Sequence, residues 1–259
     1  MSPKLFSFNR SKFDEIKNTG LQNLSGWWQS LSVGDINGDG KEDLILGNIG
    51  ENFYLRPTQS NPVKLWLSDY DGNGTVDQFL TQTINGKDMP VFLKRDITEQ
   101  FPFLKKENLK NSDYATKSIQ DLFGEKALKN ASVLRFNYCS SIVAINKGDG
   151  TFTVQPLPVR AQLSSINAIC TTDINGDGRM DLITGGNLFT FPPQFGRLDA
   201  SYGDVFINNG KGEFRWMPNT TSGINLRGEV KDIKQIETKK GKRFLVAQNN
   251  ETPVLFRLK

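Results

Sequence analysis

A nine-residue acidic segment occurs twice in this chain of 259 residues, and the repetition constrains the fold more than any other feature. The copies read Asp35-Ile-Asn-Gly-Asp-Gly-Lys-Glu-Asp43 and Asp173-Ile-Asn-Gly-Asp-Gly-Arg-Met-Asp181. A β-type run precedes each copy, and Leu-Ile follows each directly. One turn recurring between similar strands predicts an architecture of repeated β units.

Side-chain oxygens recur at positions 1, 3, 5 and 9 of each segment, and position 7 offers its backbone carbonyl. Such an oxygen-only set favours Ca²⁺, because Mg²⁺ tends to keep its waters and Zn²⁺ prefers His or Cys. The alternative is an Asp/Asn/Gly turn that binds nothing, since these residues favour turns anyway. The candidate ligands of the two segments are Asp35, Asn37, Asp39, Lys41 (carbonyl), Asp43, Asp173, Asn175, Asp177, Arg179 (carbonyl) and Asp181.

A third segment, Asp69-Tyr-Asp-Gly-Asn-Gly-Thr-Val-Asp77, has the same ligand spacing. Its candidate ligands are Asp69, Asp71, Asn73, Thr75 (carbonyl) and Asp77. An EF-hand is excluded for the two repeated segments, because it needs a bidentate Glu at position 12, where this chain has Leu46 and Thr184. The short β-branched text after both segments predicts strands rather than helices.

Composition excludes several chemistries. The chain has no histidine, which removes Ser-His-Asp and Cys-His nucleophiles, imidazole zinc sites and a histidine base. No catalytic residue is therefore assigned. The net charge of +4 is spread along the sequence and does not favour nucleic acid. No secretory signal or membrane-spanning run is visible, so we expect an excised part of a longer protein or a processed product. Cys139 and Cys170 are expected to be buried free thiols rather than a disulfide.

Two stretches share one order of strands and turns. In each, two strands flank the acidic segment, a long loop follows, and two further strands flank a tight turn. Four-stranded antiparallel units that repeat are typical of a β-propeller. The predicted strands are Leu31–Gly34, Leu44–Gly47, Lys64–Ser68 and Gln78–Thr83 in the stretch 30–84, and Ile166–Thr172, Leu182–Gly185, Asp204–Asn208 and Glu213–Met217 in the stretch 165–218.

Partial units account for the remaining strands. We expect Leu5–Asn9 and Phe13–Ile16 to be strands 3 and 4 of a preceding blade, and Ile142–Asn146 and Phe152–Gln155 to be strands 3 and 4 of a middle blade. A last blade is predicted from three strands, Val230–Ile236, Phe244–Ala247 and Val254–Leu258. The fold class is thus an all-β propeller in one domain over 1–259, with about four blades or as a fragment of a larger ring. The N-terminal strands are candidates to complete the last blade.

Residues 94–130 lose the strand pattern and gain a helical period, with Ala115, Ile119, Leu122 and Phe123 on one face. Ser112 is the predicted N-cap and Gly124 the predicted stop. A helical hairpin packed on the rim of the propeller is favoured over an element dedicated to a partner.

Topology sorts the loops of such blades onto two faces. The three acidic segments are expected on one face, and the long loops Asn48–Pro62 and Asn187–Tyr202 on the other. Aromatic side chains with Arg on loops are typical of a sugar or protein site, although they also suit packing between blades. The candidate ligand-binding residues are Tyr54, Arg56, Phe191, Phe195, Arg197 and Tyr202.

Four runs carry a family resemblance, namely Trp27–Asn48, Asp69–Asp77, Gly196–Gly203 and the ending Leu245–Asn250. Together they resemble the FG-GAP/VCBS-like repeat proteins. The chain looks most like the C-terminal part of large surface proteins of Bacteroidetes, and its acidic loops are similar to those of integrin α propellers. The resemblance implies structural Ca²⁺ and a place at the cell surface or in the periplasm. Residues 229–237 depart from the pattern, and no metal is expected there.

These features lead to one main expectation of function. We expect a non-catalytic, calcium-stabilised propeller that binds or scaffolds a glycan or a protein partner, without nucleic acid and without inserting into a membrane. The alternative is a calcium-dependent polysaccharide lyase, in which Lys or Arg would serve as the base.

Overall fold

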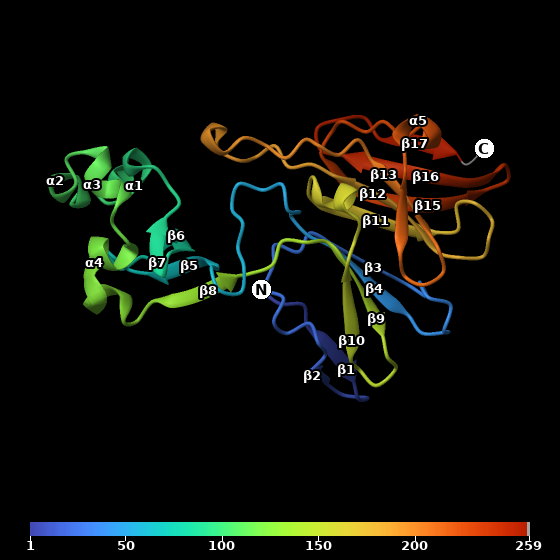
Figure 1. The fold of residues 1–259 in the computed structure, drawn as a ribbon, viewed down its shortest axis with the longest axis horizontal. Helices are drawn as coiled ribbons and strands as arrows, with labels where there is room; N and C mark the ends of the chain where they lie inside the picture. Colours follow the sequence, from blue (N-terminus) through green and yellow to red (C-terminus); the bar gives the residue numbers. More distant parts are fainter. Residues whose placement is uncertain (258–259) are drawn as a thin grey trace. The chain divides into compact units, whose positions relative to one another are not determined.

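The computed structural model describes residues 1–257, which form two compact units (Figure 1). Leu55–Tyr138, together with Met1, make one unit, hereafter the inserted unit. The blade unit comprises Ser2–Tyr54 and the chain from Cys139 onward. No helix among the described residues is both long and apolar enough to cross a bilayer. The fold is all-β, with several four-stranded antiparallel sheets, which confirms the predicted class.

The blade unit contains three blades and a hairpin, all antiparallel. The hairpin pairs β1 (Leu5–Phe8) with β2 (Phe13–Ile16). Blade 1 consists of β3 (Ser30–Gly34), β4 (Asp43–Gly47), β9 (Ile142–Asn146) and β10 (Phe152–Pro156). Blade 2 consists of β11 (Ile166–Thr172), β12 (Asp181–Gly186), β13 (Asp204–Asn208) and β14 (Phe214–Met217). Blade 3 consists of β15 (Val230–Thr238), β16 (Gly241–Gln248) and β17 (Val254–Arg257). Three short helical turns complete the unit, η1 (Val159–Gln162), η2 (Pro193–Phe195) and α5 (Asn219–Ser222).

The pairing in blade 1 corrects the prediction that 30–84 forms one blade. Strand β4 pairs with β9, through Leu44 opposite Ala144, and not with Val63–Ser68. The predicted middle blade is therefore the outer half of blade 1, and its two halves are separated by the whole inserted unit. Blade 2 has the predicted order of four consecutive strands.

Apolar residues between successive blades form the core of the blade unit. Strand β11 contacts β3 on one side and β15 on the other, so the three blades stack through their first strands. Between blades 1 and 2 lie Ile45, Val143, Leu182 and Phe206, all almost fully buried. A second cluster between blades 2 and 3 includes Ile183, Val205, Ile233, Phe244 and Val246. Burial of such clusters is the main term that holds stacked sheets together.

The stack does not close into a ring within the described residues. The prediction that the N-terminal strands complete the last blade is wrong, because β1 pairs with β2 and not with blade 3. Blade 3 has the three strands expected from the sequence; Leu258, the predicted end of the last one, lies outside the described residues.

The inserted unit is a four-stranded sheet with helices packed on one face. Its strand order is β7-β6-β5-β8, with β5 (Val63–Ser68), β6 (Asp77–Ile84), β7 (Lys87–Pro90) and β8 (Ser132–Phe136). The helices are α1 (Lys94–Gln100), α2 (Leu104–Glu107), α3 (Asn111–Ala115) and α4 (Ile119–Leu128). Tyr70, Phe79, Phe101, Leu104 and Ile119 form its core. The helical segment predicted over 94–130 thus belongs to a larger unit with a sheet and a core of its own.

Helix boundaries differ from the predicted ones. Ser118, not Ser112, is the N-cap: its Oγ accepts the N–H of Asp121, and the Asp121 carboxylate accepts the N–H of Ser118. Ser112 lies inside α3 instead. Gly124 has φ 74° and kinks α4 rather than ending it. On the predicted apolar face, Ile119 and Leu122 are buried, but Ala115 is exposed because α3 ends there.

This cap supplies a test of the helix assignment. Ser118→Ala is expected to destabilise the inserted unit by about 1 kcal/mol, because it leaves the first turn of α4 with an unpaired N–H. Ser112→Ala, an exposed position in α3, is the matched control and is expected to cost less than about 0.5 kcal/mol. Urea unfolding followed by circular dichroism measures both. Equal losses in the two variants would contradict the assignment.

Both cysteines are buried free thiols, as predicted. Burial raises the pKa of the Cys139 thiol to about 12, with a further contribution from the Glu51 carboxylate, and burial also raises the pKa of Cys170. Because the thiolate is the reactive form, we expect neither thiol to react quickly with an aromatic disulfide reagent in the native chain, and both to react in guanidinium. Rapid native labelling would contradict this burial.

Candidate metal loops

In all three acidic loops, the first carboxylate is wrapped by backbone N–H groups. Asp35 Oδ1 accepts the N–H groups of Gly38 and Asp39 at 2.8 and 3.1 Å, and Oδ2 accepts that of Gly40 at 2.9 Å. Asp69 and Asp173 accept the equivalent three bonds. The backbone N–H groups, that of Gly74 or Gly178 foremost, hold the pKa of Asp69 and of Asp173 below the usual range of an aspartate. These aspartates are therefore kept ionised and fix the loop conformation.

The ninth-position aspartates of the two repeated loops are fully buried. Asp43 accepts the N–H of Ile36 at 3.0 Å and that of Asn146, at the end of β9, at 2.7 Å. Asp181 repeats this with the N–H groups of Ile174 and Asn208, at 3.0 and 2.8 Å. Each aspartate thus ties its loop to the third strand of its blade. Burial raises the pKa of Asp181.

Basic side chains already lie beside the fifth-position aspartates of the two repeated loops and balance their negative charge. Lys41 Nζ lies 3.1 Å from Asp39 Oδ2, and this hydrogen bond lowers the pKa of Asp39. Arg179 Nη1 lies 3.8 Å from Asp177 Oδ2. The predicted amide ligands are also engaged, since Asn37 Oδ1 accepts the N–H of Asp39. Asn175 Oδ1 accepts the N–H of Asp177 in the same way.

The side chains of Lys41 and Arg179 also lie across the tight turns between strands 3 and 4 of blades 1 and 2. A Cβ added to Gly148 would come within 2.7 Å of Lys41 Cε, and one added to Gly210 within 2.9 Å of Arg179 Nε. Both glycines also have positive φ, 85° and 86°. The positive φ favours glycine at both turns, whereas the nearby side-chain atoms of Lys41 and Arg179 are flexible and can shift.

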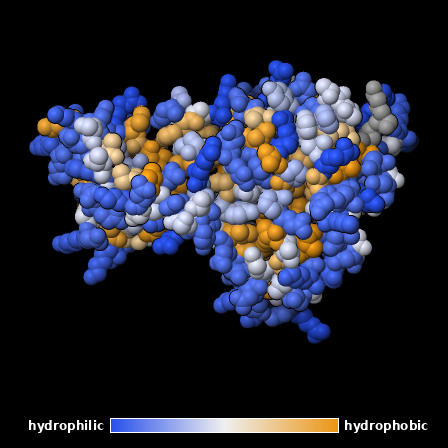
Figure 2. Space-filling model, viewed as in Figure 1, coloured by the Kyte–Doolittle hydropathy of each residue, from blue (hydrophilic) through white to orange (hydrophobic). Residues whose placement is uncertain are grey.

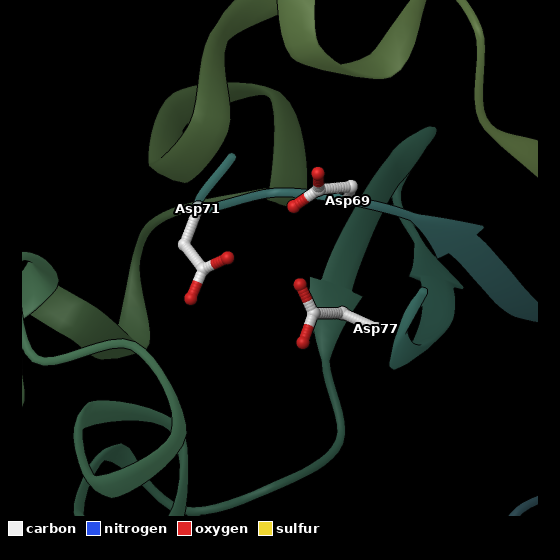
Figure 3. A group of neighbouring side chains, drawn as sticks. All are labelled: Asp69, Asp71 and Asp77. Carbon is white, nitrogen blue, oxygen red and sulfur yellow. The ribbon is translucent and has the colours of Figure 1, made fainter. Parts of the chain in front are cut away.

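The third loop differs, because no Lys or Arg among the described residues makes an ion pair with its carboxylates. Carboxylate oxygens of Asp69, Asp71 and Asp77 lie within 4.8 Å of one another, and Figure 3 shows all three groups facing one space. Asp69 and Asp71 come from the connection after β5, and Asp77 begins β6. Within the described residues this is the one group of three or more acidic, Cys or His side chains brought so close.

The side chains that hydrogen-bond to one another in and beside the third loop, apart from its carboxylates, are uncharged among the described residues. Position 5 is Asn73, whose Nδ2 donates to Asp71 Oδ2 at 2.9 Å, and position 7 is Thr75, which bonds Asn73 Oδ1. Gln100 Nε2 lies 3.4 Å from Asp77 Oδ1. Asp77 and Gln100 also line a shallow cavity of about 560 Å³ with Leu65, Val76, Gln78, Leu80 and Phe92. Three converging carboxylates repel one another unless a cation lies between them, so this donor set fits Ca²⁺.

Asn146 and Asn208 are site residues that sequence reasoning missed. Each ends the third strand of its blade, and its N–H binds the ninth-position aspartate. The Oδ1 of each accepts the N–H of the glycine two residues on, Gly148 or Gly210. The sequence pattern Asn-x-Gly-x-Gly, which occurs at Asn146–Gly150 and at Asn208–Gly212, could have identified both asparagines.

The predicted aromatic residues pack mainly on one another. Tyr54 stacks on Phe195 with ring centroids 4.4 Å apart and planes at 10°, and Phe191 packs at 5.3 Å from the buried Phe53. Arg197 lies over Phe189 and beside Asp199. Tyr202 is 39% exposed and faces Arg227 across 5.5 Å. Arg56 belongs to the inserted unit. Packing therefore occupies part of the aromatic surface, while Tyr54 and Tyr202 stay partly exposed.

Comparison with known proteins gives one match. Residues 27–66 match the model of the FG-GAP repeat, whereas no curated protein and no solved structure matches the chain. The matched segment contains β3, the first acidic loop and β4, and it extends into β5 of the inserted unit. Its sequence and the four-stranded sheet that begins with it agree with the family resemblance of Trp27–Asn48. Residues 27–66 thus match the FG-GAP repeat, and the blade unit to which most of them belong is propeller-like.

Proposed function

We propose that the chain is a non-catalytic, calcium-binding, propeller-like module that binds a protein or glycan partner at the cell surface or in the periplasm. The observation that carries the calcium proposal is the third loop, where three carboxylates converge and none makes an ion pair with a described Lys or Arg. A partner role accords with an FG-GAP repeat and with the resemblance to integrin α propellers.

The residues that would hold Ca²⁺ differ between loops. In the third loop the ligands would be side-chain oxygens of Asp69, Asp71, Asn73 and Asp77, with the carbonyl of Thr75. In the first loop they would be Asp35, Asn37, Asp39, Asp43 and the carbonyl of Lys41, and in the second the equivalent residues. Lys41 and Arg179 must leave Asp39 and Asp177 before a cation enters. We therefore propose that the third loop binds Ca²⁺ more tightly than the other two.

Calcium titration by isothermal calorimetry tests this order of affinities. In wild type we expect a strongest site with a Kd of about 10⁻⁴ M or below, followed by weaker binding. Asp71→Asn should remove the strongest phase and leave the weaker ones. Asp113→Asn, which neutralises an exposed acid on α3 of the same unit, should change neither. An unchanged titration in Asp71→Asn would refute the assignment of the third loop.

The partner is tested separately. Immobilised glycans and envelope proteins are presented to the chain with calcium and with EDTA, and retention of a defined partner supports a binding module. The lyase alternative predicts a rise in ultraviolet absorbance when uronic-acid polymers are incubated with the chain and calcium. Such a rise would refute the non-catalytic proposal.

A further inference from the structure

The outer face of blade 1 is an incomplete interface. On β3, Ser32 Oγ lies 3.3 Å from Thr171 Oγ1 of blade 2, so the alternating residues Leu31 and Val33 point away from blade 2. Leu31 is 62% exposed and Val33 44% exposed. Figure 2 shows hydrophobic surface in the region of blade 1. Two neighbouring apolar side chains are thus presented to solvent on the first strand of the stack.

The repeat shows what covers such a face. Strand register places Leu31 beside Leu46 and Val33 beside Leu44, just as Ile169 lies beside Thr184 and Thr171 beside Leu182 in blade 2. In blade 2 this face is buried: Leu182 is fully buried, and Ile169 packs against the cluster that blades 1 and 2 share. A face equivalent to that of Leu31 and Val33 is therefore covered in this chain by the inner strands of a preceding blade.

The outer half of the missing blade is already present. Ile16 of β2 lies 3.6 Å from where a Cβ on Gly150 would be, in the turn between β9 and β10. The equivalent glycine of blade 2 is Gly212, and a Cβ added there would lie 3.0 Å from Cδ1 of Ile145 in β9. The N–H of Phe152 also donates to Thr19 O, just after β2. The hairpin β1–β2 therefore contacts the β9–β10 turn of blade 1 and β9–β10 contacts the β13–β14 turn of blade 2, through β2 in the first case and β9 in the second.

An asparagine marks the position of the missing turn. Asn208 Nδ2 donates to Met180 O at 3.0 Å and also to Ile36 O, in the acidic loop of the preceding blade, at 2.7 Å. Among the described residues, Asn146 Nδ2 donates to the equivalent Glu42 O at 3.0 Å and has no such second acceptor. The donor that would contact a preceding acidic loop is thus in place on blade 1.

We propose that this half-filled slot binds a two-stranded β-hairpin, with one apolar face, that residues 1–257 do not supply. One strand of the bound hairpin pairs with the free edge of β1, and an apolar face of the hairpin covers Leu31 and Val33. The turn of the hairpin lies beside Asn146, whose Nδ2 donates to the backbone carbonyl of the second residue of that turn, as Asn208 Nδ2 donates to Ile36 O. Pairing by strand addition supplies main-chain hydrogen bonds, and the side-chain face supplies selectivity. The proposal rests on blade stacking and does not depend on calcium.

A cyclised peptide with the sequence of residues 29–48, which contains β3, the acidic turn and β4, is the probe. Closing the peptide favours the bound hairpin, because an isolated hairpin is marginally stable in water. We expect one peptide to bind per chain, in calcium and in EDTA, by fluorescence anisotropy. Hydrogen exchange should slow at Leu5–Phe8 when the peptide binds.

Surface variants decide whether binding uses this slot. Leu31→Lys with Val33→Lys should weaken peptide binding at least tenfold, and the exposure of both residues means that the fold is expected to survive. Leu255→Lys, on blade 3 and 59% exposed, is the matched control and should bind as wild type does. Absence of binding, or binding that the double variant retains, overturns the proposal. So does a dimer of the chain that the double variant abolishes, because a second copy would then cover this face.

Discussion

Asp181→Ala is expected to destabilise the blade unit by about 3–5 kcal/mol, far more than a substitution at an exposed position costs. The carboxylate is fully buried and accepts the N–H groups of Ile174 and Asn208. Its removal leaves both donors without an acceptor, and each unpaired buried donor costs about 1–3 kcal/mol. Denaturant unfolding in EDTA measures the loss without any contribution from a metal.

Asp177→Ala is the matched control for this substitution. Asp177 belongs to the same loop, but its side chain is partly exposed and its nearest cation, on Arg179, is 3.8 Å away. A surface pair of this kind contributes about 0–1 kcal/mol, so the variant should stay close to wild type in EDTA. Similar losses in the two variants would show that Asp181 does not act as a buried tie between β12 and β13.

Calcium is expected to raise the thermal midpoint of the inserted unit by roughly 10–20 °C when its concentration is about 100 times the Kd. A ligand that binds only the folded state adds about 2.7 kcal/mol at that concentration, and each kcal/mol shifts a domain of this size by about 4–8 °C. The third loop joins β5 to β6 in the centre of the sheet, so the gain applies to the whole unit. Calorimetric scans in calcium and in EDTA measure the shift.

Neutralising one ligand should separate the metal effect from loop stability. In Asp71→Asn the shift between EDTA and calcium should fall to a few degrees, while the midpoint in EDTA is kept or raised because repulsion among three carboxylates is relieved. Asp113→Asn should retain the full shift. A wild-type midpoint that calcium does not move would mean that the third loop is a turn without a resident cation.

The repeated loops were predictable because their conformation is decided locally. Asp35 and Asp173 bind N–H groups three to five residues further along the chain, and the glycines at positions 4 and 6 provide the positive φ that the loop needs. The strand before each loop pairs with the strand after it, as the sequence indicated. Local hydrogen bonds and turn residues were therefore enough to assign both hairpins.

Partners distant in sequence were harder to predict. Strands Val63–Ser68 and Asp77–Ile84 follow β4 with the length, apolar content and acidic turn expected for the second half of its blade. What decides between Val63–Ser68 and Ile142–Asn146 as the partner of β4 is packing: Val143 is buried against blade 2, and Phe79 against the helices of the inserted unit. That choice depends on tertiary contacts that a local pattern does not contain.

The sequence identified candidate site residues by type and spacing, but it did not show what surrounds them in the fold. Spacing alone assigned Asp43, Asp77 and Asp181 to one role, yet Asp43 and Asp181 are held by the N–H groups of Asn146 and Asn208, whereas Asp77 faces Gln100. Likewise, Lys41 and Arg179 entered the prediction only through their carbonyls, while their side chains pair with Asp39 and Asp177. Charge compensation thus distinguishes the third loop from the repeated pair.

The way the inserted unit joins blade 1 bears on the order of folding. The insert enters through β5 and leaves through β8, and these strands are hydrogen-bonded neighbours, with Val63 opposite Phe136. Once the insert is folded, its ends are held together, which shortens the loop between β4 and β9 about fourfold and lowers the entropic cost of their pairing by roughly 1.2 kcal/mol. Blade 1, although it begins earlier in the chain, should therefore assemble after the unit that interrupts it.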